Sequence, residues 1–129
     1  MGAIDLKPAS ILLIRRYVDH ADEFDAKLRL VHAVPGASPD IQYGLDQDLP
    51  RFLLQAARAE IARLQSVAGT NLEVCMDGGA VSKIVRAAAQ HHDADLVLIG
   101  RGTLQEKFGQ LRTNAYAIIR DAPCPVLSI

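Results

Sequence analysis

The sequence predicts an α/β fold in which a five-stranded parallel sheet is covered on both faces by about four helices. We expect a doubly wound, Rossmann-like arrangement of three layers with the strand order 3-2-1-4-5. The first observation behind this prediction is that short apolar runs alternate with segments of helical periodicity along the whole chain. Right-handed crossovers between parallel strands then place helices on both faces. The second is that Asp95–Ile99 is apolar after its first residue, as is typical of a central strand covered on both sides.

The first half of the chain predicts two strands and one helix. Met1–Asp5 is a short apolar strand, and Pro8 and Ser10 open a helix. Ile11–Ile14 alone would also fit a strand, but apolar residues continue at steps of three and four, which favours the helix. These residues are Leu13, Ile14, Tyr17, Val18, Ala21 and Phe24. Lys27–Val34 then forms a buried strand, and Pro35–Gln47 forms a surface loop.

The second half continues the alternation. Asp48 and Pro50 are suited to begin a helix, and Gly69 and Thr70 are suited to end it. The remaining elements, in chain order, are a helix over Arg51–Val67, a strand over Asn71–Met76, a turn over Asp77–Gly79, a helix over Ala80–His91, the strand Asp95–Ile99, a loop over Gly100–Leu111, a helix over Thr113–Arg120 and a strand over Pro125–Ile129.

Composition narrows the class of protein. The 129 residues suit a single domain over 1–129. With 14 basic and 15 acidic residues, the net charge of −1 argues against nucleic-acid and membrane-surface partners. No apolar stretch approaches the ~20 residues that span a bilayer, and no signal peptide is visible. Cys75 and Cys124 are too few for a disulfide framework, so we expect a cytoplasmic protein with reduced thiols.

Candidate ligand-binding residues follow the predicted strands. Ligands of such sheets bind beyond the carboxyl ends of the strands, where the strand order reverses. That edge carries Asp5, His32–Pro35, Asp77–Gly79 and Gly100–Thr103, and helices start near it at Ser10 and Thr113. The N-terminus of a helix favours the binding of anions such as phosphate. Structural interpretations stay open: Asp5, Ser10 and Thr113 could cap, and the glycines could only turn the chain.

The sequence offers little for catalysis or metal binding. His91 and His92 fit a solvated helix end, His20 falls on a polar helix face, and His32 alone could face the ligand edge. No cluster has metal-ligand spacing, so we expect no metal. Neither a nucleophile elbow nor a Gly-x4-Gly-Lys-[Ser/Thr] phosphate loop is present.

Three segments, Ala94–Gly100, Ala122–Leu127 and Phe24–Val34, resemble the universal stress protein family. Ala94–Gly100 and Ala122–Leu127 are similar to its Ala-Asp-Leu-x-Val-x-Gly and Ala-Pro-Cys-Pro-Val-Leu patterns, and Phe24–Val34 resembles its second strand. The resemblance covers nearly the whole chain and places Asp5 at the family's aspartate after the first strand. It implies a cytoplasmic stress-response protein that forms a homodimer through Pro125–Ile129. Adenine nucleotide, ATP or AMP with Mg²⁺, is its implied ligand, and a further protein partner is possible.

The nucleotide motif of the family is incomplete in this chain. ATP-binding members carry Gly-x2-Gly-x9-Gly-[Ser/Thr], of which Gly102 and Thr113 keep the second spacing. Arg112 replaces the third glycine, and one residue instead of two separates Gly100 from Gly102. A side chain at position 112 blocks close backbone approach, although its guanidinium could also bind phosphate.

We therefore expect weak or absent nucleotide binding in a regulatory protein. If nucleotide binds, the resemblance implies a site formed by Asp5, Gly100, Gly102, Arg112 and Thr113. The alternative is a functional ATP- or AMP-binding member with slow nucleotide hydrolysis. A phospho-acceptor receiver domain has similar layering, but receivers continue into a helix after the fifth strand.

Overall fold

The computed structural model describes residues 1–38, 48–101 and 110–129, without the side chains of residues 110–113. Its parallel sheet has the order β3-β2-β1-β4-β5, which confirms the predicted fold class. None of the described helices is long and apolar enough to cross a membrane. The elements are β1 (Gly2–Ala3), α1 (Ser10–Glu23), β2 (Arg29–Val34), α2 (Leu49–Ala68), β3 (Glu73–Gly78), α3 (Val81–His91), β4 (Val97–Ile99), α4 (Gln110–Asp121) and β5 (Val126–Ser128).

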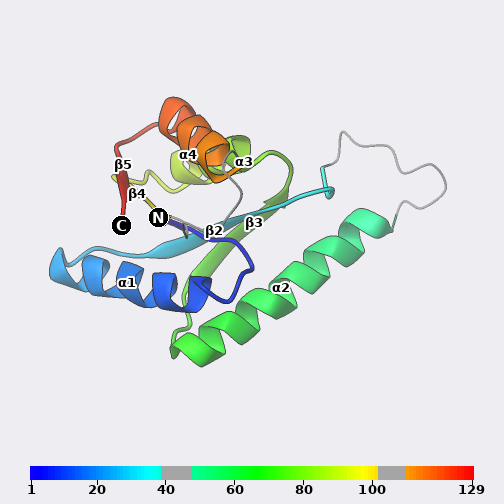
Figure 1. Ribbon diagram of the computed structural model, residues 1–129, viewed down its shortest axis with the longest axis horizontal. Helices are drawn as coiled ribbons and strands as arrows, with labels where there is room; N and C mark the ends of the chain where they lie inside the picture. Colours follow the sequence, from blue (N-terminus) through cyan, green and yellow to red (C-terminus); the bar gives the residue numbers. More distant parts are fainter. Residues whose placement is uncertain (39–47, 102–109) are drawn as a thin grey trace.

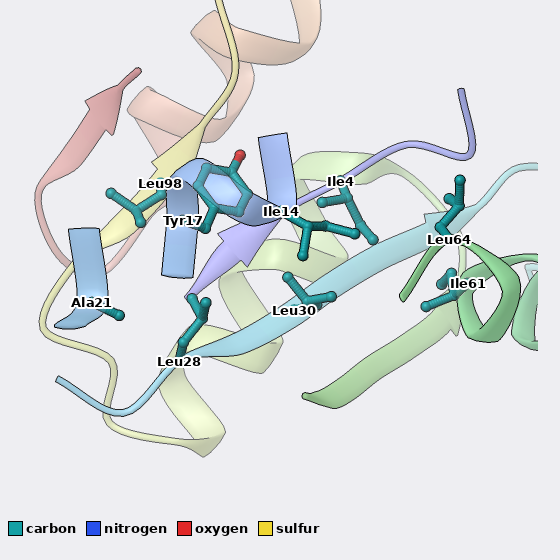
Figure 2. Packing of buried hydrophobic residues seen from close by; sticks show 9 residues of the cluster. All are labelled: Ile4, Ile14, Tyr17, Ala21, Leu28, Leu30, Ile61, Leu64 and Leu98. Atoms are coloured by element: carbon teal, nitrogen blue, oxygen red, sulfur yellow. The ribbon is translucent and has the colours of Figure 1, made fainter. Parts of the chain in front are cut away.

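The sheet is the middle of three layers. Helices α1 and α2 cover one face, and α3 and α4 cover the other (Figure 1). Successive residues of β2 point to opposite faces. Leu30 therefore joins Ile14 and Tyr17 in the core under α1 and α2 (Figure 2), whereas Val31 joins Val85 in the core under α3 and α4. Most of the apolar residues predicted for these elements thus pack into the core on one or the other face of the sheet.

Strand β1 is short but central. Beyond its two residues, the Ile4 N–H donates to the Val31 carbonyl and the Met1 carbonyl accepts from the Leu98 N–H, at 3.0 and 2.7 Å. Gly2 packs closely against α1, because a Cβ there would lie 2.4 Å from the ring of Tyr17. Helix α1 therefore packs directly against β1, the strand that ends at the ligand edge.

Strand β3 begins and ends two residues later than predicted, over Glu73–Gly78 instead of Asn71–Met76. Asp77 and Gly78 pair in register with Ala33 and Val34 of β2, so they are not part of a turn. The prediction of a turn over Asp77–Gly79 is wrong for these two residues, because β2 continues far enough to offer them partners. The chain turns only at Gly79, whose φ of 143° is a backbone conformation that other residues rarely adopt.

Helix α1 ends one residue earlier than the apolar spacing predicts. Phe24 is the residue after the helix, and Asp25 follows with a left-handed φ of 49°. This ending turns Phe24 outward, where 65% of it is exposed and its ring lies beside His20, with 4.9 Å between ring centroids. The expectation that Phe24 faces the core is therefore wrong.

Candidate functional site

The carboxyl edge between β1 and β4 is where this fold offers a ligand site. The chain leaves β1 through α1 on one face of the sheet, and it enters β4 from α3 on the other face (Figure 1). Such a reversal opens a crevice beyond the ends of the two strands. Asp5 follows β1 by two residues and Gly100 follows β4 directly, so the fold brings these two predicted residues to the same edge.

The carboxylate of Asp5 is held by the turn that leads into α1. Its Oδ1 accepts hydrogen bonds from the Lys7 N–H at 2.9 Å and from the Ser10 hydroxyl at 2.8 Å. The residue is exposed, and its Oδ2 accepts no hydrogen bond from the described residues. Asp5 therefore stabilises the turn and still keeps one oxygen available to a ligand.

Ser10 begins α1 without capping it. The residue before the helix is Ala9, and the N–H groups of Ser10 and Ile11 already donate to the carbonyls of Lys7 and Pro8. The interpretation of Ser10 as an N-cap, which the sequence left open, does not hold, because the backbone of the preceding residue is already helical. The hydroxyl, on a residue that is only 2% exposed, bonds to Asp5 instead.

The phosphate side of the predicted site is placed only in part. Gly102 lies outside the described residues. Arg112 and Thr113 lie in the first turn of α4, and their side chains are outside the described part of the structure. Because α4 begins at Gln110, Thr113 is its fourth residue, and the prediction that the helix starts there is wrong. Gln110, Leu111 and Arg112 are good helix formers and extend the helix toward its N-terminus.

Gly100 has a packing reason in addition to any binding role. Its φ is not positive, so a sharp turn does not require glycine there. A Cβ at this position would lie 2.8 Å from Cδ2 of Leu13 in α1. The missing side chain therefore lets the end of β4 approach α1 closely, beside the crevice.

Tyr17 lies under the site, although sequence reasoning assigned it only to the core. Its side chain is fully buried, and its hydroxyl donates to the Ala3 carbonyl at 2.8 Å. Burial, and secondarily the negative charge of Asp5, raise the pKa of the phenol well above its ordinary value of 10. Tyr17 therefore stays neutral near Asp5. A buried tyrosine usually needs a hydrogen-bond partner, and that is the signal by which sequence reasoning could have found this role.

A hydrogen bond of the His32 side chain connects β2 to the end of β1. Its Nδ1 lies 2.9 Å from the Ile4 carbonyl, and because a carbonyl only accepts, Nδ1 carries the proton. Its Nε2 is buried and has no hydrogen-bond partner among the described residues. The residue is 7% exposed, so it supports the site from below rather than lining an open surface.

The described residues contain neither an activated thiol nor a cluster of metal ligands. Burial raises the pKa of the Cys75 and Cys124 thiols, so neither is an activated nucleophile. No three His, Cys, Asp or Glu side chains in the described ranges are grouped to hold a metal ion. Two surface hollows of about 410 and 430 Å³ lie elsewhere, one between α2 and β3 and one at the amino ends of the central strands.

Comparison with known proteins identifies the family. The model described as "Usp: Universal stress protein family" matches residues 1–129. The chain belongs to the universal stress protein family. Universal stress protein A of Yersinia pestis is 26% identical to it over 132 residues, which cover 98% of this chain and 87% of that protein. These matches confirm the resemblance noted in the sequence and support a role in the stress response.

Solved structures of universal stress proteins share the fold. The universal stress protein UspA from Lactobacillus plantarum matches with a TM-score of 0.72 and 26% identity, over 98% of this chain and 93% of that one. A universal stress protein in complex with cAMP matches with a TM-score of 0.63 and 20% identity, over 99% and 93% of the two chains.

Proposed function

We propose that this universal stress protein is a cytoplasmic, non-catalytic regulator that forms a homodimer and binds an adenine nucleotide weakly at the β1/β4 edge. The observation that supports the binding site best is the Asp5 carboxylate, which is fixed through Oδ1 and open at Oδ2. An oxygen that only accepts suits the amino and hydroxyl donors of a nucleoside. The cAMP complex of a protein with this fold makes adenine nucleotides the first probes to test.

The phosphate side gives the reason for weak affinity. In this proposal, Gly100, Gly102 and Thr113 approach the phosphates, as their spacing resembles that of the family motif. Arg112 occupies the place of the third glycine, and its side chain hinders the close approach of backbone N–H groups. The nucleotide therefore keeps the contact with Asp5, but some of the backbone contacts to its phosphates are lost.

The lack of catalysis in this proposal follows from the groups around Asp5. The Ser10 hydroxyl is buried and donates a hydrogen bond to Asp5, and the raised pKa of Tyr17 keeps the phenol protonated. Hydrolysis of a phosphoanhydride needs a base that positions water, or carboxylates that hold a metal ion near the phosphates. We therefore expect no ATP turnover above the uncatalysed rate.

The variant Asp5→Asn tests the nucleotide site. It should weaken ATP binding about tenfold, because asparagine keeps an oxygen for Lys7 and Ser10 but presents an amide donor in place of Oδ2. Isothermal titration calorimetry of the wild type and the variant measures the change. Asp19→Asn, on the exposed side of α1, is the matched control and should bind like the wild type. Equal affinity of Asp5→Asn and the wild type would remove Asp5 from the site.

The variant Arg112→Gly tests the reason given for weak binding. Restoring the glycine should tighten ATP binding about tenfold, because backbone N–H groups can then approach the phosphates. Thr113→Val should weaken ATP binding both in the wild type and in the Arg112→Gly variant. Calorimetry under identical salt conditions gives both values. Weaker binding by Arg112→Gly would mean that the guanidinium itself holds phosphate, which contradicts the obstruction that we propose.

The proposed dimer rests on the free edge of the sheet. β5 is the last strand in the sheet order and, among the strands that the structure describes, pairs only with β4. An open edge with apolar side chains favours pairing with another strand. Leu127 of β5 is 38% exposed, and the preceding helix α4 exposes Tyr116 and Ile119. A second copy that pairs its own β5 along this edge would cover these side chains.

Leu127→Lys should convert the dimer into a monomer, because the charge would face the same charge across the two-fold axis. Sedimentation velocity at micromolar concentration measures the mass of the wild type and of the variant. Leu12→Lys, at a leucine of α1 that is 54% exposed, is the control and should remain dimeric. A dimer that persists in Leu127→Lys would place the interface elsewhere.

A further inference from the structure

The Ser10 hydroxyl is committed to Asp5 rather than to its own helix. Its Oγ lies 2.8 Å from Asp5 Oδ1 and 2.9 Å from the Asp5 carbonyl oxygen, so its one proton is shared between two oxygens of the same residue. A serine at a helix start usually serves the free N–H groups of the helix and stays near solvent. Here the residue is 2% exposed and makes no capping hydrogen bond.

This contact leaves the Asp5 side chain little freedom. Oδ1 receives both the Ser10 hydroxyl and the Lys7 N–H, which fixes the plane of the carboxylate from two directions. Oδ2 is then presented in one orientation, although the residue itself is exposed. A binding group that is already immobilised loses less conformational entropy when the ligand arrives.

We propose that Ser10 is a positioning residue for nucleotide binding, which acts by orienting Asp5 so that Oδ2 meets a donor group of the nucleotide. This inference rests on the proposed function, because it needs Asp5 to contact the ligand. Ser10 itself does not touch the nucleotide. Without its hydroxyl, the carboxylate keeps the Lys7 N–H alone and can rotate away from the crevice.

A double-mutant cycle separates positioning from a general structural role. Ser10→Ala should weaken ATP binding about fivefold in the wild-type background, a change of the size that one ordinary hydrogen bond contributes. In the Asp5→Ala background, the same substitution should change affinity less than twofold, because no carboxylate remains to be oriented. NMR titration with ATP measures affinities into the millimolar range. Ser66→Ala, at an exposed serine of α2, should bind like the wild type.

Each outcome decides between the interpretations. Equal weakening by Ser10→Ala in both backgrounds would show a structural effect and overturn the inference, as would unchanged affinity in the wild-type background. A wild type that binds no ATP would overturn the proposed function and the inference with it, whereas a binding wild type with an unaffected Ser10→Ala overturns the inference alone. If thermal unfolding shows that Ser10→Ala is not folded, Ser10→Cys, which keeps the volume and weakens the donor, takes its place in the cycle.

Discussion

Replacing Gly78 with alanine is expected to lower the free energy of unfolding by about 3 kcal/mol, the upper end of the usual cost of overpacking. An added Cβ would lie 1.8 Å from the Ala37 carbonyl oxygen and 2.2 Å from its carbon. These are backbone atoms, so no change of rotamer relieves the overlap. The segment is also held in place, because the N–H groups of Ala37 and Gly79 both donate to the Val34 carbonyl.

Denaturant unfolding of Gly78→Ala and Gly69→Ala measures this effect against a matched control. Gly69 ends α2 with a φ of 77°, but nothing lies within 4 Å of the position of its Cβ. Alanine there should cost only about 1 kcal/mol, the strain of a left-handed backbone. If the two variants lose the same stability, the chain does not cross β3 as closely as the structure places it.

Gly78 also shows where sequence reasoning reaches its limit. The order of the strands and their parallel pairing were predictable, because apolar runs and helical periodicity alternate along the chain. The end of β3 was not predictable, because Asp-Gly-Gly is a typical turn sequence. Only the length of the neighbouring β2 extends the pairing to Gly78. Phe24 is a similar case: its spacing fits α1, but the left-handed Asp25 ends the helix first.

The candidate site was also predictable only in part. Asp5 and Gly100 could be placed at one edge because chain order and strand direction determine where strands end. The bond from Ser10 to Asp5 depends on the helical turn at Lys7–Ala9, which changes the direction of the Ser10 side chain. Local turn geometry of this kind has no signature in residue spacing. The helix start at Gln110 was missed because the capping preference of Thr113 outweighed helix propensity in our interpretation.

Tyr17→Ala is expected to have the largest effect of any single substitution considered, a loss of about 4 kcal/mol in the free energy of unfolding. The ring is fully buried between α1 and the central strands (Figure 2), and it packs against Gly2. Tyr17→Phe keeps the ring and removes only the hydrogen bond to the Ala3 carbonyl, so it should cost about 1–2 kcal/mol.

Chemical unfolding of the two Tyr17 variants therefore separates ring packing from the hydrogen bond. Tyr116→Ala, at a tyrosine that is 69% exposed on α4, is the control and should change stability by less than about 0.5 kcal/mol. A loss in Tyr17→Phe as large as that in Tyr17→Ala would mean that the Ala3 carbonyl, rather than the ring, holds α1 against β1. Asp5 lies two residues beyond that strand, and its charge adds to the effect of burial in raising the pKa of Tyr17. Either result therefore also shows how firmly the residues under the proposed nucleotide site are held.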